Sequence, residues 1–170
     1  MEAVLVSSCL LGHAVRYDGG DKRCDHEILQ RWLREGRVVA VCPEVAVGQA
    51  VPRLPAEITG GNGGLSVHAG IGRVVDSSAQ DLSAEFIKAA EHALAIARSK
   101  GIRIAILKEG SPSCGSRFTY DGTFTHTKIA SPGVTAAWLQ HAGIEVFSEE
   151  QLVEADLRLK QIEAQNGNPV

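Results

Sequence analysis

The chain has 170 residues, of which 44% are hydrophobic and 22% are charged, and its formal net charge is −3. This length suits one domain with a substantial core. The slight acidity gives no general attraction to nucleic acid or to an anionic membrane, although a local pocket could still bind a free nucleobase. No apolar run reaches the roughly 18 residues of a membrane helix, and the segment before Ser7 is too short for a secretory signal, so we expect a cytoplasmic protein.

Two buried strands are predicted in the first quarter of the chain. Residues 3–8 form a β-rich run that ends at Cys9, and residues 38–41 form a second run that ends at Cys42. Pro43 lacks a backbone N–H and therefore stops the second strand. Each strand is expected to lead into a loop that begins with a cysteine.

One helix is predicted after each of these strands. The first has Asp25 as its N-cap and ends at Gly36, and the second, which is longer, opens at Ser78 or Asp81 and ends at Gly101. Apolar residues recur at helical spacing in both: Ile28, Leu29, Trp32 and Leu33 in the first, and Leu82, Phe86, Ala89, Ala90, Ala93, Leu94 and Ala97 in the second.

Two segments carry turn signals instead of a helical pattern. Residues 51–75 contain prolines and a glycine-rich run at 60–64, which predicts a loop followed by a short hairpin over residues 65–75. Residues 118–125 alternate around an Asp-Gly pair, which predicts a small surface hairpin.

The rest of the chain predicts two further strands and two further helices. Residues 102–107 form a third buried strand, which runs into the loop that carries Cys114, and residues 145–147 form a fourth strand. A helix is expected after Gly133, and a last helix follows the fourth strand and buries Leu152, Ala155, Leu159 and Ile162.

Strands that alternate with helices predict an α/β fold, namely a single-domain, Rossmann-like, mostly parallel sheet flanked by helices, with a small hairpin insertion. We expect one domain over residues 1–170, with its core at about residues 3–163. Ligands of such sheets bind beyond the carboxyl ends of the strands. Because Cys9, Cys42 and Cys114 each follow a predicted strand, parallel pairing would bring them to one edge of the sheet.

The four cysteines allow several interpretations. A reducing compartment keeps thiols free, and the lack of a C-x-x-C excludes the usual zinc-ribbon, thioredoxin and ferredoxin loops. Each cysteine on its own could be a small core residue. Three thiolates at one edge could instead hold zinc with an open position, or three irons of a cubane cluster. Cys24 lacks such a setting and is interpreted as incidental, or as a redox-sensitive surface thiol.

Five short motifs occur in a fixed order between about residue 4 and residue 150. They are Cys9-Leu10-Leu11-Gly12, Arg16-Tyr17-Asp18-Gly19, Cys42-Pro43-Glu44, Ser111-Pro112-Ser113-Cys114-Gly115, and Gly133-Val134-Thr135-Ala136 followed by Gly143-Ile144-Glu145-Val146. In this order they resemble the signature of one bacterial family, the 2-thiouracil desulfurases of the TudS type. The resemblance covers nearly the whole chain.

The resemblance implies a 4Fe–4S cluster held by Cys9, Cys42 and Cys114, with a fourth iron free to bind the sulfur of a substrate. It also implies that a thiolated pyrimidine (2-thiouracil, 4-thiouracil or a nucleoside) exchanges C=S for C=O without net redox change. The sequence departs from the family pattern at Ser8, where alanine is common, and at Cys24, which is not part of the pattern.

A thiocarbonyl carbon is a sluggish electrophile, so the attack of water on it needs a base. Glu44 is the candidate because it lies two residues from Cys42; the alternative is that it caps the next helix or pairs with Arg53. Ser111 is the candidate for orienting the water or the ring, and Ser113 is the runner-up. The alternative for both serines is a plain Ser-Pro turn.

Charged residues near the motifs supply the remaining candidates. Lys108, Lys22 and Arg16 could stabilise charge on the cluster or on a substrate anion, although most such side chains are simply solvated. Asp18 lies in a glycine-rich turn and is either a turn residue or a substrate contact. Two other functions stay open, namely a zinc hydrolase on the same thiolates and a cluster-bearing sensor or sulfur carrier without turnover. The acidic balance argues against intact nucleic acid as the substrate.

Overall fold

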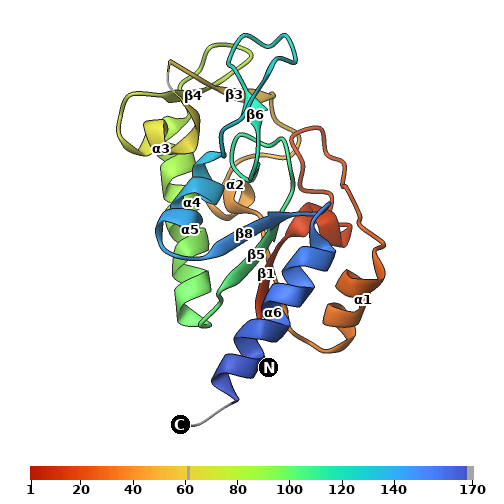
Figure 1. Ribbon diagram of the computed structural model, residues 1–170. Helices are drawn as coiled ribbons and strands as arrows, with labels where there is room; N and C mark the ends of the chain where they lie inside the picture. Colours follow the sequence, from red (N-terminus) through yellow and green to blue (C-terminus); the bar gives the residue numbers. More distant parts are fainter. Residues whose placement is uncertain (61, 168–170) are drawn as a thin grey trace.

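A four-stranded parallel sheet forms the centre of the molecule in the computed structural model, which describes residues 1–60 and 62–167. Its strand order is β2-β1-β5-β8, and every neighbouring pair is parallel (Figure 1). The strands are β1 (Val4–Ser7), β2 (Val38–Val41), β5 (Ile104–Leu107) and β8 (Glu145–Ser148). All four predicted strands are therefore confirmed, as is the α/β class with a mostly parallel sheet.

Helices cover both faces of this sheet. Helices α1 (Glu27–Arg34) and α6 (Leu152–Asn166) pack on one face, and α4 (Ser83–Ser99) and α5 (Val134–His141) pack on the other (Figure 1). The alternation of side chains along a strand explains this arrangement. On β1, Val4 and Val6 belong to the core under α1 and α6, whereas Leu5 belongs to the core under α4 and α5.

Two of the predicted helix starts are corrected by the local hydrogen bonds. The N-cap of α1 is His26, whose Nδ1 accepts from the N–H of Ile28 at 3.2 Å, whereas the expected cap, Asp25, pairs with Arg23. Helix α4 begins at Ser83, and the carboxylate of Asp81 accepts from the Ser83 N–H at 2.9 Å. Asp81 is thus closer to the true start than Ser78.

A helix replaces the hairpin that was expected over residues 65–75. Strands β3 (Ala56–Thr59) and β4 (Arg73–Asp76) pair antiparallel, and α3 (Gly63–His68) lies between them, so the prediction of a strand at Leu65 was wrong. A Cβ at Gly64 would overlap the carbonyl oxygen of Gly133. The glycines that look like a loop in the sequence therefore allow α3 to approach the start of α5 closely.

The predicted surface hairpin is present, but its second strand comes later than expected. Strand β6 (Thr119–Tyr120) pairs with β7 (Lys128–Ile129), which begins beyond the predicted limit at residue 125. Two short helices follow the first two strands: η1 (Ser8–Leu11) begins directly after β1, and α2 (Pro43–Ala46) begins one residue after β2. Among the described residues, no helix combines the length and apolar character needed to cross a bilayer.

The chain order of the strands fixes where a ligand would bind. From β1 the chain passes to β2 on one side and later returns to β5 on the other side of β1. Such a reversal leaves a crevice at the carboxyl ends of the two central strands. In Figure 1 the β3, β4 and β6 segments lie above this edge of the sheet.

Candidate active site

A cavity of about 760 Å³ lies at the carboxyl edge of the sheet. It is lined by residues that follow β1, β2 and β5, and by residues of the β3–β4 and β6–β7 pairs. The three cysteines of the predicted ligand set line it, each beyond the end of a different strand. Cys9 lies in η1 after β1, Cys42 lies between β2 and α2, and Cys114 lies in the loop after β5. The sheet therefore brings together three cysteines that are far apart in sequence.

The environment of these thiols opposes their ionisation. Cys9 and Cys114 are buried, and Cys42 is half-buried. Burial raises the pKa of Cys9 to about 11 and also raises the pKa of Cys42. The pKa of Cys114 is raised by burial and further by its neighbours Cys9, Glu44 and Cys42, while a hydrogen bond from Ser7 opposes the shift. At neutral pH these groups become thiolates only if a nearby positive charge, such as a metal centre, compensates the burial.

The donor set of three thiols suits an iron–sulfur cluster. Three sulfur atoms suit soft metals and iron–sulfur clusters. Within residues 1–60 and 62–167, however, no three His, Cys, Asp or Glu side chains are placed to hold one metal ion. A cubane takes one thiolate on each of three irons, so its ligands are spaced more widely than those of one tetrahedral zinc.

Cys24 lies outside the cavity. Its side chain packs beside the core under α1 and α6, and its N–H donates to the carbonyl of Leu10 at 2.9 Å. The three other cysteines all line the cavity, so the structure separates Cys24 from them as the sequence predicted.

Glu44 lines the cavity from α2 and is paired with Arg53. Its Oε2 accepts from Nε of Arg53 at 2.8 Å and from Nη2 at 2.7 Å. The pKa of Glu44 is raised by burial, and the charge of Arg53 opposes this shift. The pairing of Glu44 with Arg53, which the sequence analysis gives as an alternative to the role of base, is therefore confirmed. It does not remove Glu44 from the cavity, because no protein group among the described residues donates to Oε1.

The two serines of the Ser-Pro motif point to different places. Ser111 lines the cavity, and its Oγ accepts from the N–H groups of Ser113 and Cys114 at 3.1 and 3.2 Å. These bonds occupy the oxygen's acceptor sites and leave its own proton free to donate. Ser113 is fully buried and its hydroxyl bonds Thr135 at 2.8 Å. The expected substrate contact by Ser113 is corrected, because this hydroxyl faces α5 and not the cavity.

The charged candidates also divide into two groups. Lys108, Lys22 and Arg16 line the cavity, and the ammonium group of Lys108 pairs with Glu149 and donates to the carbonyl of Glu109 at 3.0 Å. Asp18 is exposed and lies outside the cavity lining. Its carboxylate accepts from the N–H of Gly20 at 2.9 Å, which lowers its pKa. Asp18 is thus a turn residue, and its position outside the cavity lining does not support a substrate contact.

Comparison with known proteins decides the family. The family model of 2-thiouracil desulfurases matches residues 4–151. The chain belongs to this family. It is also 43% identical over 149 residues to the uncharacterized protein YbbK of Bacillus subtilis (strain 168), a match that covers 88% of this chain and 97% of YbbK. A solved structure, described as the [4Fe-4S]-dependent thiouracil desulfidase TudS, superposes with a TM-score of 0.86 at 46% identity, covering 95% of this chain and 99% of that one.

An aromatic wall in the cavity that the cysteines also line was not predicted for this member of the desulfurase family. Phe118 and Tyr120 meet edge to face with ring centroids 6.1 Å apart, and His126 meets Tyr120 in the same way at 6.2 Å. The ammonium group of Lys128 lies 4.3 Å from the centroid of the Phe118 ring. All four line the cavity. The sequence signal was the alternating pattern at 118–125, which was read as a surface hairpin because its contact with the sheet edge is non-local.

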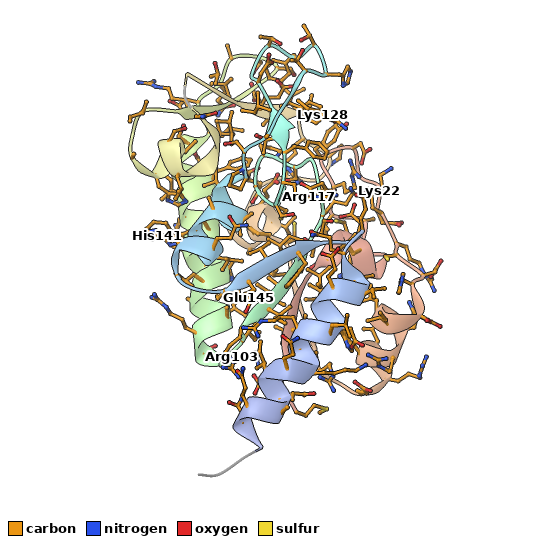
Figure 2. All side chains as sticks on the ribbon, viewed as in Figure 1. Lys22, Arg103, Arg117, Lys128, His141 and Glu145 are labelled. Carbon is orange, nitrogen blue, oxygen red and sulfur yellow. The ribbon has the colours of Figure 1, made fainter. Side chains whose placement is uncertain are left out.

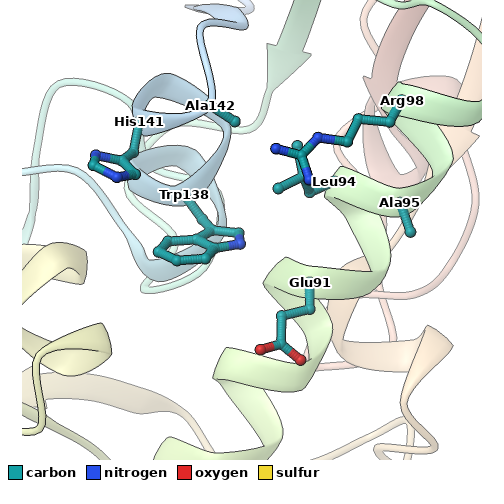
Figure 3. Close-up of a pocket in the computed structure, with 7 residues that line it drawn as sticks. All are labelled: Glu91, Leu94, Ala95, Arg98, Trp138, His141 and Ala142. Atoms are coloured by element: carbon teal, nitrogen blue, oxygen red, sulfur yellow. The ribbon is translucent and has the colours of Figure 1, made fainter.

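A second, smaller cavity of about 460 Å³ lies between α4 and α5, away from the thiols (Figure 3). Trp138 is its largest side chain. The ring stacks with His68, at a centroid distance of 4.3 Å, and with His141, at 5.7 Å. None of the three cysteines lines this cavity.

Proposed function

We propose that this desulfurase removes sulfur from a thiolated pyrimidine, replacing C=S by C=O, with the help of a 4Fe–4S cluster held by Cys9, Cys42 and Cys114. Water supplies the oxygen and both protons, and the sulfur leaves as hydrogen sulfide, so no electrons are gained or lost overall. The observation that carries the proposal is the meeting of three thiols from three strand ends in one cavity. Family membership and the TudS likeness support it.

When bound, such a cluster supplies a Lewis-acidic iron that has no protein ligand and that suits a soft thiocarbonyl sulfur. In this proposal Cys9, Cys42 and Cys114 would each bind one iron of the cluster and leave one iron without a protein ligand. The burial of Cys9 and Cys114 limits the contact of the centre with bulk water, which strengthens electrostatic interactions with the reacting group.

The side chains of α2 and of the loop after β5 have separate tasks in this proposal. Glu44 accepts a proton from the attacking water at Oε1, while Arg53 holds Oε2 and fixes the orientation of the carboxylate. Ser111 donates its hydroxyl proton to the ring or to the water. Lys108 is the candidate for stabilising charge on the substrate, together with Lys22 and Arg16 at the cavity wall.

The whole chain, residues 1–170, is proposed to act as one desulfurase domain on a small molecule. The net charge of −3 does not favour intact nucleic acid as a substrate. We keep the cytoplasm as the proposed location, because free thiols of the kind seen here persist in reducing compartments.

A substrate panel tests the function. Protein purified without oxygen and loaded with iron and sulfide is incubated with 2-thiouracil, 4-thiouracil and the corresponding nucleosides, and released sulfide and the oxo product are measured. We expect equal amounts of both from at least one compound. A protein that carries the cluster but releases no sulfide from any of them would instead be the sensor or sulfur carrier.

A further inference from the structure

A buried carboxylate closes the loop that carries Cys114. Glu109 follows β5 and is only 7% exposed. Its Oε1 accepts from three consecutive backbone N–H groups, those of Ser116, Arg117 and Phe118, at 2.9, 3.1 and 3.3 Å. Its Oε2 accepts from the hydroxyl of Ser116 at 2.9 Å and from Nε of Arg117 at 3.3 Å. The carboxylate thus joins the start of the loop to its end.

The inside of the same loop has little room to rearrange. The N–H of Gly115 donates to the carbonyl of Ser111 at 2.9 Å, and the carbonyl of Gly115 accepts from the N–H of Gly133 at 2.7 Å. A Cβ at Gly115 would overlap the carbonyl oxygen of Phe118. Cys114 lies between Glu109 and the residues at 116–118 that bind its carboxylate. Its N–H donates to the hydroxyl oxygen of Ser111.

Glu109 itself has no capacity left for acid–base work. Burial alone would raise its pKa, but hydrogen bonds, first from the Arg117 N–H and then from the Ser116 hydroxyl, outweigh burial and hold the pKa below its usual range. Both oxygens are occupied by donors of the loop. The ionised carboxylate therefore stabilises the conformation of the loop, although Glu109 lines the cavity.

We propose that Glu109 is a positioning residue that fixes the loop between β5 and β6 so that the Cys114 thiol faces the other two cluster thiols. This inference rests on the proposed function, since it assumes that Cys114 is a cluster ligand. Without the carboxylate, three neighbouring N–H groups lose their acceptor and the loop gains freedom, so Cys114 reaches the cluster in only part of the population. Groups that orient metal ligands typically contribute about 10- to 100-fold in metal affinity.

The test compares Glu109→Gln with wild type, and Glu145→Gln serves as the matched control. Glu145 also holds an arginine, Arg158, at 2.7 Å, but it lies on β8, and Figure 2 shows it apart from Arg117. After anaerobic loading, the rate of iron loss to a chelator and the electron paramagnetic resonance spectrum of the reduced cluster are recorded. We expect E109Q to lose iron at least about tenfold faster and to show an altered spectrum, and E145Q to behave as wild type.

A second measurement does not depend on the cluster. In the iron-free protein, amide hydrogen exchange at residues 116–118 reports the loop alone, and we expect it to be faster in E109Q and unchanged in E145Q. If E109Q does not fold, Ser116→Ala removes a single donor to Oε2 and is expected to give a smaller effect in the same direction.

Two results would separate the possible failures. A folded E109Q, or in its place S116A, that retains iron as firmly as wild type, with the same spectrum, overturns the positioning role. A wild-type protein that takes up no cluster at all overturns the proposed function instead, whatever the exchange of residues 116–118 shows.

Discussion

Glu44 and Ser111 share a cavity with the three thiols, but their hydrogen bonds suit them to different tasks. Arg53 engages only one oxygen of Glu44, so the other remains available to water. The hydroxyl oxygen of Ser111 accepts hydrogen bonds from the backbone of its own loop, so its proton is available to donate to a substrate group. An acceptor and a donor therefore border the space in which a thiocarbonyl and a water molecule would meet.

At this scale we expect Glu44→Gln to retain the cluster and to lose turnover. The amide keeps an oxygen for Arg53 but cannot take a proton from water, and loss of a general base typically costs about 10²- to 10⁴-fold in rate. Sulfide release per bound cluster measures the effect, with iron content as the control. Turnover within a few-fold of wild type would remove Glu44 from the role of base.

The helices depend on a few buried contacts that join distant elements. Asp156 on α6 accepts from Arg31 and Trp32 on α1, with Nε1 of Trp32 at 3.2 Å, and from Lys160 at 2.8 Å. Burial would raise its pKa, but the hydrogen bond with Lys160 and the charge of Arg31 outweigh burial, so the pKa lies below the ordinary 3.8. This carboxylate ties the last helix to the first.

The lowered pKa of Asp156 predicts a pH dependence of stability. Because the unfolded chain binds the proton more readily, Asp156 stabilises the fold fully above about pH 4, and this contribution is lost as the pH falls through the lower, folded-state value. Asp156→Asn should therefore lower the free energy of unfolding by about 1–3 kcal/mol at pH 7 and by less at pH 3.

Urea unfolding at the two pH values measures this difference. Glu91→Gln, at an exposed position on α4 beside the cavity of Figure 3, is the control and should change stability little at either pH. A loss in D156N that is equally large at pH 3 and pH 7 would show that the carboxylate's charge is not the cause.

The contact between α3 and α5 depends on the absence of a side chain. The N–H of Gly64 donates to the carbonyl of Pro132 at 2.7 Å, and a Cβ at Gly64 would overlap the backbone of Gly133. We expect Gly64→Ala to destabilise the protein by about 1–3 kcal/mol, because backbone must move to make room. Gly167→Ala is the control, since its Cβ would meet only ordinary contacts. Equal unfolding midpoints for the two variants would disprove the close approach.

The whole molecule brings its site together through topology, and that part was open to prediction. Four buried runs and the helices between them suffice for a parallel sheet, and a parallel sheet places Cys9, Cys42 and Cys114 at one edge. Which side chains of these loops face the cavity is decided by non-local contacts. Ser111 and Ser113 are two residues apart, yet one borders the cavity and the other bonds Thr135 on α5, which no local pattern reveals.

The same limit explains the elements that were misread. The glycine-rich run before α3 has the composition of a loop, and its helical form depends on packing against the start of α5, which is about 70 residues away in the chain. The aromatic wall depends on the hairpin folding back over the sheet edge. Composition and period describe neighbours in sequence, whereas these features are set by neighbours in space.

The most direct test of the account is cluster content in single cysteine variants. Cys9→Ala, Cys42→Ala, Cys114→Ala and Cys24→Ala are loaded with iron and sulfide under identical anaerobic conditions, and iron per chain and sulfide release from the best substrate are measured. We predict that the first three lose both the cluster and the activity while their far-ultraviolet circular dichroism stays that of wild type, and that C24A keeps both. Full iron content and turnover in any one of C9A, C42A or C114A would contradict the claim that these three cysteines together hold the cluster.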